Sequence, residues 1–393
     1  KEEKIIGSGG FGNVYLIKDK EKGITYAAKE LKYMPKNLNM LKKHTDLLHE
    51  VNILSEISHP CIMKLICYST LNFENEEKPV IVTEYIKNGS LEQILSLERE
   101  NVNLDFWNDT MRLINIYGIA IAISYLHSND IIHLDIKPLN VLVDDFLFPK
   151  LCDFGLSKQI SSDNDDDDNG DDIKAIIGTP SFMAPEAFNG IVTKASDVYS
   201  FAILVYEIMN KTIPYDMDYQ RIMYSVAFMQ RRPEFKSDIP KVYKQLIERC
   251  WNQDPEKRPT MKKVVEELKD NRDFITKNVD EKIYYMYIKM IDEQIKGTDV
   301  SFITNTLFKK YSINQIFREY EESFTRSYES ITQDLSCFEI QEEIEKGEVS
   351  TVYKIVNSKT GEIYSATISN FTEPTIFQNI KKKSKEVEVL RQI

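Results

Sequence analysis

Hydrophobic and polar residues alternate around several glycines over the first 32 positions of the chain. Successive side chains of a strand point to opposite faces, so this alternation predicts strands joined by tight turns. We therefore expect the chain to open with a small sheet.

One helix and a further strand complete this first region. DLLHEVNILSEI, at 46–57, has four apolar residues at helical spacing, which are Leu47, Val51, Leu54 and Ile57. PVIVTEYI, at 79–86, predicts a strand that ends at the turn signal KNGS. From about residue 90 to residue 270 the pattern is mostly helical. It predicts an α+β fold with two lobes: a small antiparallel β lobe plus one helix, then a larger helical lobe.

Composition narrows the class of protein. With 42% hydrophobic residues among 393, the chain can bury large cores, which excludes disorder throughout. A net charge of −12 argues against a nucleic-acid-binding surface, because phosphate contacts need clustered Lys and Arg. Five cysteines without CxxC spacing fit a reduced chain, so we expect an intracellular, cytoplasmic protein. We expect no membrane span, because no apolar run reaches roughly 18 to 20 residues. No signal peptide is recognisable, and because the chain starts at Lys1 we expect a piece of a longer protein.

The stretch GSGGFGNV, at 7–14, carries Gly7, Gly9 and Gly12 in G-x-G-x-x-G spacing. A dinucleotide-binding fold needs a helix after this motif, but VYLIKDK continues as a strand. A P-loop would need Gly-Lys-Ser or Gly-Lys-Thr, which is absent. The remaining interpretation is a glycine-rich hairpin whose backbone can approach phosphates closely.

Two charged residues follow this hairpin. Lys29 ends YAAK in a predicted strand, and Glu50 lies on the next predicted helix. A pair between them would hold the ammonium ready for anionic oxygens, although each residue taken singly is more simply a surface charge.

HLDIKPLN, at 133–140, brings together Asp135, Lys137 and Asn140, and DFG supplies Asp153 thirteen residues after Asn140. Two oxygen ligands at the two ends of an apolar hairpin suit a hard Mg²⁺ ion, especially one already held by triphosphate oxygens. This region therefore predicts a metal and phosphate site.

Three more stretches follow in order, which are GTPSFMAPE at 178–186, SDVYSFAILVYE at 196–207 and CWNQDPEKRPTM at 250–261. With the motifs above, the ordered set resembles the protein kinases over residues 1 to about 270. The resemblance implies a kinase domain at 1–272, with an N-lobe at 1–85 and a C-lobe at 86–272. It also implies transfer of the γ-phosphate of ATP to Ser or Thr hydroxyls of protein substrates in intracellular signalling, with Mg²⁺, or Mn²⁺ as an alternative ion.

Carried over residue by residue, the resemblance assigns the catalytic positions. Lys29 would contact the α- and β-phosphates and pair with Glu50. Asp135 would accept or orient the proton of the attacking hydroxyl, and Lys137 would balance charge on the transferred phosphoryl group. The metal ligands would be Asn140 and Asp153.

The resemblance also assigns the nucleotide pocket and its frame. Val14 and Ala27 would pack on the adenine ring, with Thr83 as gatekeeper before a hinge. The nucleotide-binding set is Ile6, Gly7, Ser8, Gly9, Gly10, Phe11, Gly12, Asn13, Val14, Ala27, Lys29, Thr83, Glu84, Ile86 and Leu142. The activation segment would include Asp153, Phe154, Gly155, Thr179 and Glu186. The structural positions would be His133, Asp197 and Arg258, with Arg258 paired to Glu186 and Asp197 bracing the catalytic loop.

Lys137 and Thr179 are similar to their counterparts in Ser/Thr kinases, whereas SDVYSFAILVYE and CWNQDPEKRPT resemble the tyrosine-kinase-like group of these enzymes. Dual specificity therefore stays open. Leu134 departs from the family, since most members have an arginine there that pairs with an activation-segment phosphate. We expect that the absence of this arginine leaves phosphoryl transfer intact and removes the need for that phosphate.

The stretch SDNDDDDNGDD, at 162–172, contains seven aspartates and predicts an exposed loop. Four positions from Asp165 onward match an EF-hand loop, but the twelfth is Ile176 instead of glutamate, which disfavours calcium. A third interpretation is that the loop attracts basic substrates or partners.

The last 56 residues repeat the beginning of the chain at an offset of 338, after a predicted helical connector at 273–337. The resemblance implies a truncated second kinase N-lobe at 338–393 that is degenerate, because Thr367 stands at the place of Lys29 and Glu345 at that of Gly7. A pseudokinase scaffold that binds partners without transferring phosphate is therefore the alternative function, although the first domain keeps every reacting position.

Overall fold

Five antiparallel strands form the sheet of the first lobe, in the order β1-β2-β3-β5-β4. Their bounds are β1 (Lys4–Ser8), β2 (Gly12–Lys18), β3 (Thr25–Leu31), β4 (Leu65–Ser69) and β5 (Val80–Glu84). The computed structural model describes residues 4–8, 12–31, 50–76, 78–160, 178–236, 238–313, 315–316, 338–346, 350–357 and 363–369. Within the predicted helix at 46–57, residues 50–56 are helical, and residues 46–49 lie outside the described part.

The alternation of β3 separates the two faces of this sheet. Ala28 is fully buried and packs with Val80 and Val82, while Tyr15 and Tyr26 cover this cluster. Residues on either side of Ala28 must point to the opposite face, because side chains alternate along a strand. That opposite face is the one that receives Lys29.

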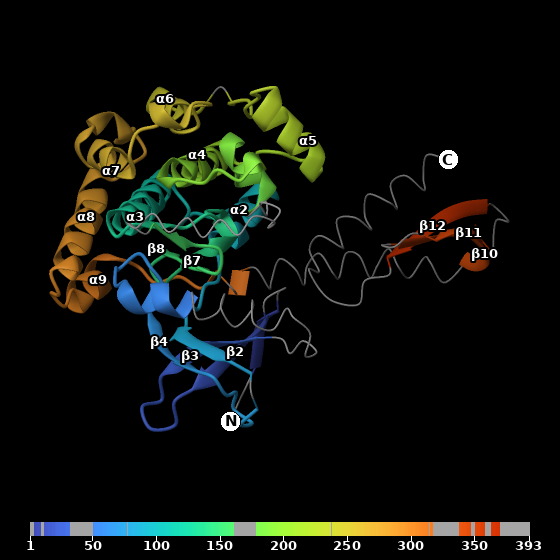
Figure 1. Ribbon diagram of the computed structural model, residues 1–393, viewed down its shortest axis with the longest axis horizontal. Coiled ribbons are helices and arrows are strands. Elements are labelled where there is room, and N and C mark those ends of the chain that lie inside the picture. The colour runs from blue at the N-terminus through green and yellow to red at the C-terminus, as the bar shows by residue number, and fades with distance from the viewer. Residues whose placement is uncertain are drawn as a thin grey trace, which may run out of the picture. The chain divides into compact units, whose positions relative to one another are not determined.

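The second lobe is helical and is built around two buried helices, α3 (Asp109–Ser128) and α4 (Lys194–Asn210). Both have apolar residues around most of their circumference, as in IYGIAIAI and FAILVYEI, which is the pattern of a helix buried on all sides. The remaining helices of this lobe are α2 (Leu91–Arg99), α5 (Tyr219–Met223), α6 (Lys241–Cys250) and α7 (Met261–Asp270). Figure 1 shows them around α3 and α4.

Two short strand pairs frame the segments that carry the candidate chemistry. β6 (Ile131–Ile132) pairs with β9 (Lys158–Gln159), and β7 (Val141–Val143) pairs with β8 (Pro149–Leu151). The first pair brackets both the HLDIKPLN and the DFG segments in sequence, and the second lies between them. The two segments are therefore held side by side.

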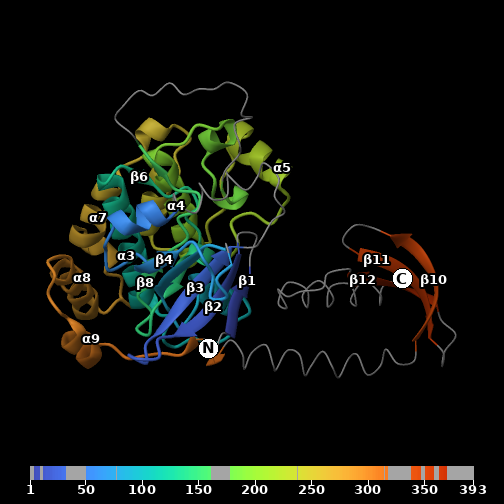
Figure 2. The same ribbon diagram turned by 60° about the horizontal axis from the view of Figure 1, so that its bottom comes forward.

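Two further helices follow the helical lobe, α8 (Glu281–Ile295) and α9 (Ser301–Leu307). Figures 1 and 2 both show α8 beside α3. The chain divides into two compact units at 1–314 and 315–393, so both helices belong to the first unit. The predicted domain boundary at 272 thus falls inside this unit, and residues 273–313 of the predicted connector belong to the same unit as the helical lobe.

The described part of the second unit contains a three-stranded antiparallel sheet. Its strands are β10 (Phe338–Lys346), β11 (Ser350–Asn357) and β12 (Ile363–Ser369), in the order β10-β11-β12.

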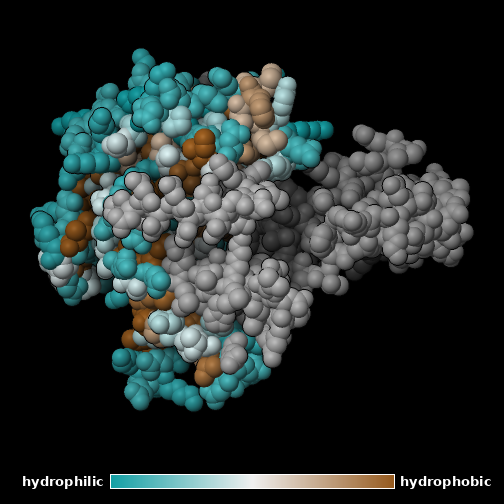
Figure 3. Space-filling model, viewed as in Figure 1, coloured by the Kyte–Doolittle hydropathy of each residue, from teal (hydrophilic) through white to brown (hydrophobic). Residues whose placement is uncertain are grey.

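Much of the described surface in the view of Figure 3 is hydrophilic, and hydrophobic residues are exposed in the region of α5. Tyr224, Phe228 and Met229 are 58%, 66% and 47% exposed, respectively. Among the described residues, no helix combines the length and the apolar character needed to cross a membrane.

Candidate active site

Lys29 lies at the centre of the first group of candidate residues. Its Nζ atom is 2.9 Å from Glu50 Oε2 and 3.5 Å from Asp153 Oδ1. A Cβ atom added to Gly155 would lie within 4 Å of both carboxylates, which places the DFG segment against the helix that carries Glu50. The structure therefore joins a strand of the sheet, the helix and the DFG segment through one ammonium group.

The two carboxylates determine the charge of this lysine. Burial by itself would lower the pKa of Lys29, but the negative charges of Glu50 and then Asp153 outweigh it and raise the pKa above its usual value. Lys29 therefore stays an ammonium group at neutral pH. It is held in place as a donor for anionic oxygens.

Asp135, Lys137 and Thr179 form the second group. Lys137 Nζ lies 2.7 Å from Asp135 Oδ2 and donates to Thr179 Oγ1 at 2.7 Å, while Thr179 Oγ1 donates to Asp135 Oδ1 at 2.7 Å. Burial would raise the pKa of Asp135, but the hydrogen bond and the charge of Lys137, together with the Thr179 hydroxyl, lower it. Asp135 is therefore an ionised carboxylate at neutral pH.

Asn140 connects this group to the candidate metal site. Its Nδ2 atom donates to the backbone oxygen and to Oδ2 of Asp135, both at 2.8 Å. Since these two bonds use the amide nitrogen, the amide oxygen is the atom that can face a cation. The Asp153 side chain is 37% exposed and lies on the same segment as Cys152, whose N–H donates to Asn140 O at 2.9 Å. An amide oxygen and a partly exposed carboxylate fit the ligand preference of a hard divalent cation.

The carboxylate of Asp197 shapes the loop that carries Asp135. Oδ1 accepts from the N–H of Leu134 at 2.9 Å, and Oδ2 accepts from the N–H of His133 at 2.8 Å and contacts His127 Nε2 at 2.9 Å. Leu134 has a φ of 68°, a left-handed conformation that is unfavourable for leucine. The two hydrogen bonds from the loop backbone to Asp197 hold it there.

His133 links the loop to the DFG segment. Asp135 N–H donates to His133 Nδ1 at 3.3 Å, so the proton of the neutral ring is on Nε2, which donates to Cys152 O at 3.1 Å. The His133 ring also lies edge-on to Phe154, with 5.0 Å between the centroids. Through these contacts the positions of Asp135 and Asp153 depend on each other.

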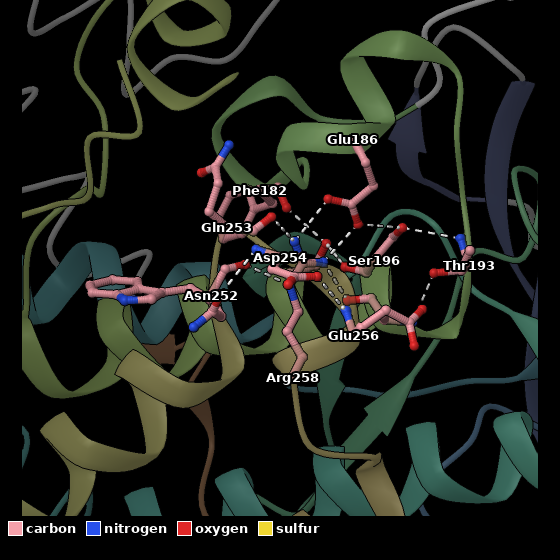
Figure 4. Close-up of polar contacts among 12 residues, drawn as sticks. Phe182, Glu186, Thr193, Ser196, Asn252, Gln253, Asp254, Glu256 and Arg258 are labelled. Carbon is pink, nitrogen blue, oxygen red and sulfur yellow. Dashed lines mark hydrogen bonds and ion pairs between the residues drawn. The ribbon is translucent and has the colours of Figure 1, made fainter. Parts of the chain in front are cut away.

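Glu186 and Arg258 form a bidentate ion pair, as the sequence predicts. Arg258 Nη1 is 2.7 Å from Glu186 Oε1, and Nη2 is 2.8 Å from Oε2. Figure 4 shows Ser196 beside the same carboxylate, to which its hydroxyl donates at 3.0 Å. The Arg258 side chain is completely buried, so this pair anchors the segment at 180–189 to the helical lobe.

The predicted adenine pocket is lined by residues that share one face of the sheet. Ala27 pairs with Thr83 across β3 and β5, and Val14 pairs with Lys29 across β2 and β3, so each pair lies on a common face. Glu84 N–H donates to Lys64 O at 3.0 Å, which leaves its carbonyl as the group that can meet a ligand.

The other predicted nucleotide-binding residues lie around this face. Leu142, on β7, bridges to Ser90 beyond the hinge, and Ile86 is half-buried. Ile6 and Gly7 lie at an irregularity of β1, where a Cβ on Gly7 would touch Val14. Strands β1 and β2 contain Ser8, Gly12 and Asn13, while Gly9, Gly10 and Phe11 lie outside the described residues. The acidic stretch at 162–172 also lies outside them.

Gly178 is a position beside the candidate site that the sequence did not single out. Its φ is 118°, and a Cβ atom there would lie 2.9 Å from the backbone oxygen of Leu134. Only glycine adopts this conformation freely at such a close approach. Gly178 thereby lets the next residue, Thr179, reach Asp135, and its only signal in the sequence is its place before that threonine.

Comparison with known proteins agrees with this geometry. The family model of the protein kinase domain matches residues 1–268. The dual specificity protein kinase shkA of Dictyostelium discoideum is 34% identical over 275 residues, which are 68% of this chain and 48% of shkA. The dual specificity protein kinase shkC of the same organism is 31% identical over 277 residues, 68% of this chain and 50% of shkC. A putative serine/threonine-protein kinase/receptor of Acanthamoeba polyphaga mimivirus is 33% identical over 289 residues, 71% of this chain and 16% of that protein.

The two lobes and the site between them thus define a protein kinase fold, and this chain belongs to the protein kinase family. The chain spans about half the length, or less, of these relatives. Membership of this family implies ATP and a divalent metal ion as participants in the reaction.

Proposed function

We propose that this protein is a kinase that transfers the γ-phosphate of ATP to Ser or Thr hydroxyls of protein substrates, with Mg²⁺ as the preferred ion. The observation that carries the proposal is the joining of two charge clusters, one around Lys29 and one around Asp135, through the Asn140 and Asp153 segments. Phosphoryl transfer needs positioned cations on the phosphates and a carboxylate at the attacking hydroxyl, and this arrangement supplies both.

Each residue has a defined task in this proposal. Lys29, aligned by Glu50, binds oxygens of the α- and β-phosphates. The substrate hydroxyl oxygen bonds to the γ-phosphorus while the bond from that phosphorus to the bridging oxygen breaks and leaves ADP, and Asp135 accepts the hydroxyl proton. Lys137 balances the charge of the phosphoryl group in flight. Asn140 and Asp153 would hold the metal ion, which supplies further positive charge when bound.

Substrate class rests on the triangle of Asp135, Lys137 and Thr179. Thr179 ties the activation segment to the catalytic carboxylate, and the presence of both Lys137 and Thr179 is similar to Ser/Thr kinases. Two relatives are named dual specificity protein kinases, so phosphorylation of Tyr is a second outcome that this site allows. We place the chain in the tyrosine-kinase-like group on its segments at 196–207 and 250–261.

Transfer of labelled phosphate from ATP to a basic protein tests the proposal. We expect Asp135→Asn to lower the turnover by about 10² to 10⁴-fold, because it removes the proton acceptor. Asp105→Asn makes the same chemical change at an exposed loop and should leave the turnover unchanged. Equal transfer by Asp135→Asn and the parent chain would refute phosphotransfer at this site and favour a scaffold without catalysis. Phosphoamino acid analysis of the product then separates Ser/Thr from dual specificity.

The second unit is, we infer, a degenerate kinase N-lobe, and its strand register supports this. Gly7 pairs with Val14 and Val14 with Lys29 in the first sheet, whereas Glu345 pairs with Val352 and Val352 with Thr367 in the second. Each pairing is shifted by the same 338 residues, and both first strands have an irregularity at the equivalent point. A carboxylate at Glu345 and the missing ammonium at Thr367 both oppose nucleotide binding by this unit.

The setting of the activity is also part of the proposal. Cys61, Cys67, Cys152 and Cys250, the cysteines among the described residues, are all unpaired, which fits a reduced intracellular compartment. The aspartates of 162–172 would attract basic substrates or partners. Raising the salt concentration should then increase the KM for a basic protein substrate more than the KM for ATP.

A further inference from the structure

The segment that follows α9 is fastened to the chain just beyond the hinge. Asn88 Nδ2 donates to Tyr311 O at 3.1 Å, and Asn88 Oδ1 accepts from Ile313 N–H at 2.9 Å. Both Asn88 and Ile313 are completely buried. One asparagine side chain therefore pairs with the backbone of a segment more than 220 residues further along the chain.

The same turn is bonded to β7 and to the residue that follows it, beside the predicted nucleotide-binding residue Leu142. Asn88 Nδ2 also donates to Asp144 O at 2.9 Å, and Gly89 O accepts from Val143 N–H at 2.9 Å. Ser90 forms a bridge with Leu142, which belongs to the predicted nucleotide-binding set. Contacts made by Asn88 therefore bear on the position of Leu142.

Aromatic contacts reinforce this attachment. Phe308 lies edge-on to Phe148 with 4.8 Å between centroids, and the Tyr311 ring lies 5.1 Å from the Phe106 ring. Tyr311 N–H donates to Asp145 O at 2.8 Å. The segment at 308–313 thus holds the turn between β7 and β8 as well as the turn after the hinge.

Helix α8 makes a second attachment through Tyr287, which is completely buried. Tyr287 Oη lies 3.4 Å from Cys61 Sγ, and the Tyr287 ring lies 4.7 Å from the Phe148 ring. Cys61 O accepts from Leu151 N–H at 2.8 Å. Cys61 follows the helix that carries Glu50, and Leu151 lies two residues before Asp153. Tyr287 therefore contacts the loop that follows the helix of Glu50, and this loop is hydrogen-bonded to the strand that leads to Asp153.

A glycine on α3 of the kinase lobe leaves space for Tyr287. A Cβ atom on Gly118, in the middle of α3, would lie 2.5 Å from Tyr287 Oη and 2.5 Å from Pro149 Cγ. A glycine inside a helix is less favourable than an alanine, so its presence here is explained by the close approach of Tyr287 and Pro149. Gly118 lies within the matched family domain, whereas Tyr287 lies beyond it.

We propose that residues 281–313, which we call the brace, set the affinity of the kinase lobe for its nucleotide, with Asn88, Tyr287 and Ile313 as positioning residues. The brace contacts the turn after the hinge, the turn between β7 and β8, and the loop that follows the helix of Glu50. Its contacts given above, all among described residues, are with supporting positions and not with the predicted reacting groups. The proposal rests on the proposed function in taking the nucleotide to be ATP.

Titration of the full chain with a fluorescent ATP analogue tests the brace. We expect Ile313→Ser and Asn88→Ala each to raise the Kd of the analogue by about 5- to 150-fold, the usual range of coupling between two sites. Ile295→Ser is the matched control, because Ile295 ends α8 and is 52% exposed, and it should leave the Kd unchanged. Variants that unfold at a lower temperature but keep the parent Kd would reduce the brace to a stabilising element and overturn the proposal.

Hydrogen exchange supplies a second test that needs no substitution. Coupling is reciprocal, so binding of the analogue should slow exchange of the Tyr311 and Ile313 amides, which contact Asp145 and Asn88. Unchanged exchange at both amides in the saturated chain would overturn the proposal. A chain that binds the analogue with these responses but transfers no phosphate would contradict the proposed function alone, and a chain that does not bind it would overturn both.

Discussion

Replacing Gly118 with alanine tests the contact between α3 and α8 most directly. In the interior of a helix this change normally stabilises a protein by about 1 kcal/mol. At Gly118 the added methyl group meets Tyr287 Oη and Pro149 Cγ, both at 2.5 Å. Tyr287 and Pro149 are buried, so neither ring can move aside into solvent.

The magnitude follows from two opposing terms. Overpacking of a well-packed core costs about 1 to 3 kcal/mol, and two simultaneous contacts with rings place this case at the upper end. Subtracting the helix gain of about 1 kcal/mol leaves a net destabilisation of about 2 kcal/mol. In a Tyr287→Phe background the contact with the hydroxyl is gone and that with Pro149 remains, so the cost should fall to about 1 kcal/mol.

Urea denaturation followed by tryptophan fluorescence measures the free energy of unfolding of the helical lobe. The chain has two tryptophans, Trp107 and Trp251, and both are buried in the helical lobe. The emission therefore reports unfolding of the lobe that contains Gly118. If Gly118→Ala stabilised the lobe, or cost the same with Phe at 287 as with Tyr, the close approach of α8 would be wrong.

Three further predictions concern single groups. Burial raises the pKa of Asp144 to about 6, so the stability that the protonated form contributes is complete below the ordinary pKa of about 4 and is lost as the pH rises through 6. Asp144→Asn should therefore be more stable than the parent at pH 7 by roughly 1 to 3 kcal/mol. Urea denaturation at pH 5 and 7 measures this gain, and no such gain would mean that the carboxylate is well solvated. Glu186→Ala leaves the buried Arg258 without its partner and should cost about 3 to 5 kcal/mol in thermal unfolding, whereas a loss below about 1 kcal/mol would mean that water reaches the guanidinium. Leu134 stands where most kinases have an arginine that binds an activation-segment phosphate, so complete dephosphorylation should leave the turnover number unchanged. A large drop in turnover would show that another cationic side chain binds such a phosphate.

The candidate catalytic residues could be singled out because the chemistry that they suggest is local in sequence. Asp135, Lys137 and Asn140 lie within six positions, and Asp153 follows across a short hairpin, so residue type and spacing already indicate a metal and phosphate site. The pairing of Lys29 with Glu50 was also predictable, because a strand and the next helix commonly pack together. The structure brings these side chains within hydrogen-bond distance.

The brace could not be predicted in the same way. Asn88 stands in KNGS, where asparagine is explained by the turn alone, and nothing local indicates that its side chain binds residues 311 and 313. The aromatic residues around Tyr287 predict a buried helix face, but periodicity gives the face of a helix and never its partner. From the sequence alone, Gly118 is only a poor helix former. The reason for a glycine at this position appears once Tyr287 is seen to occupy the space that a side chain would need.

The two backbone hydrogen bonds accepted by Asp197 have a consequence for local opening of the catalytic loop. Asp197 lies in the first turn of α4, where the helix dipole favours its charge, and it is completely buried. Freeing the amides of His133 and Leu134 would leave that buried carboxylate with its contact to His127 but without these two hydrogen bonds, so we expect these amides to open rarely. We therefore expect the amides of this loop to exchange slowly, although the loop has no regular secondary structure at these residues.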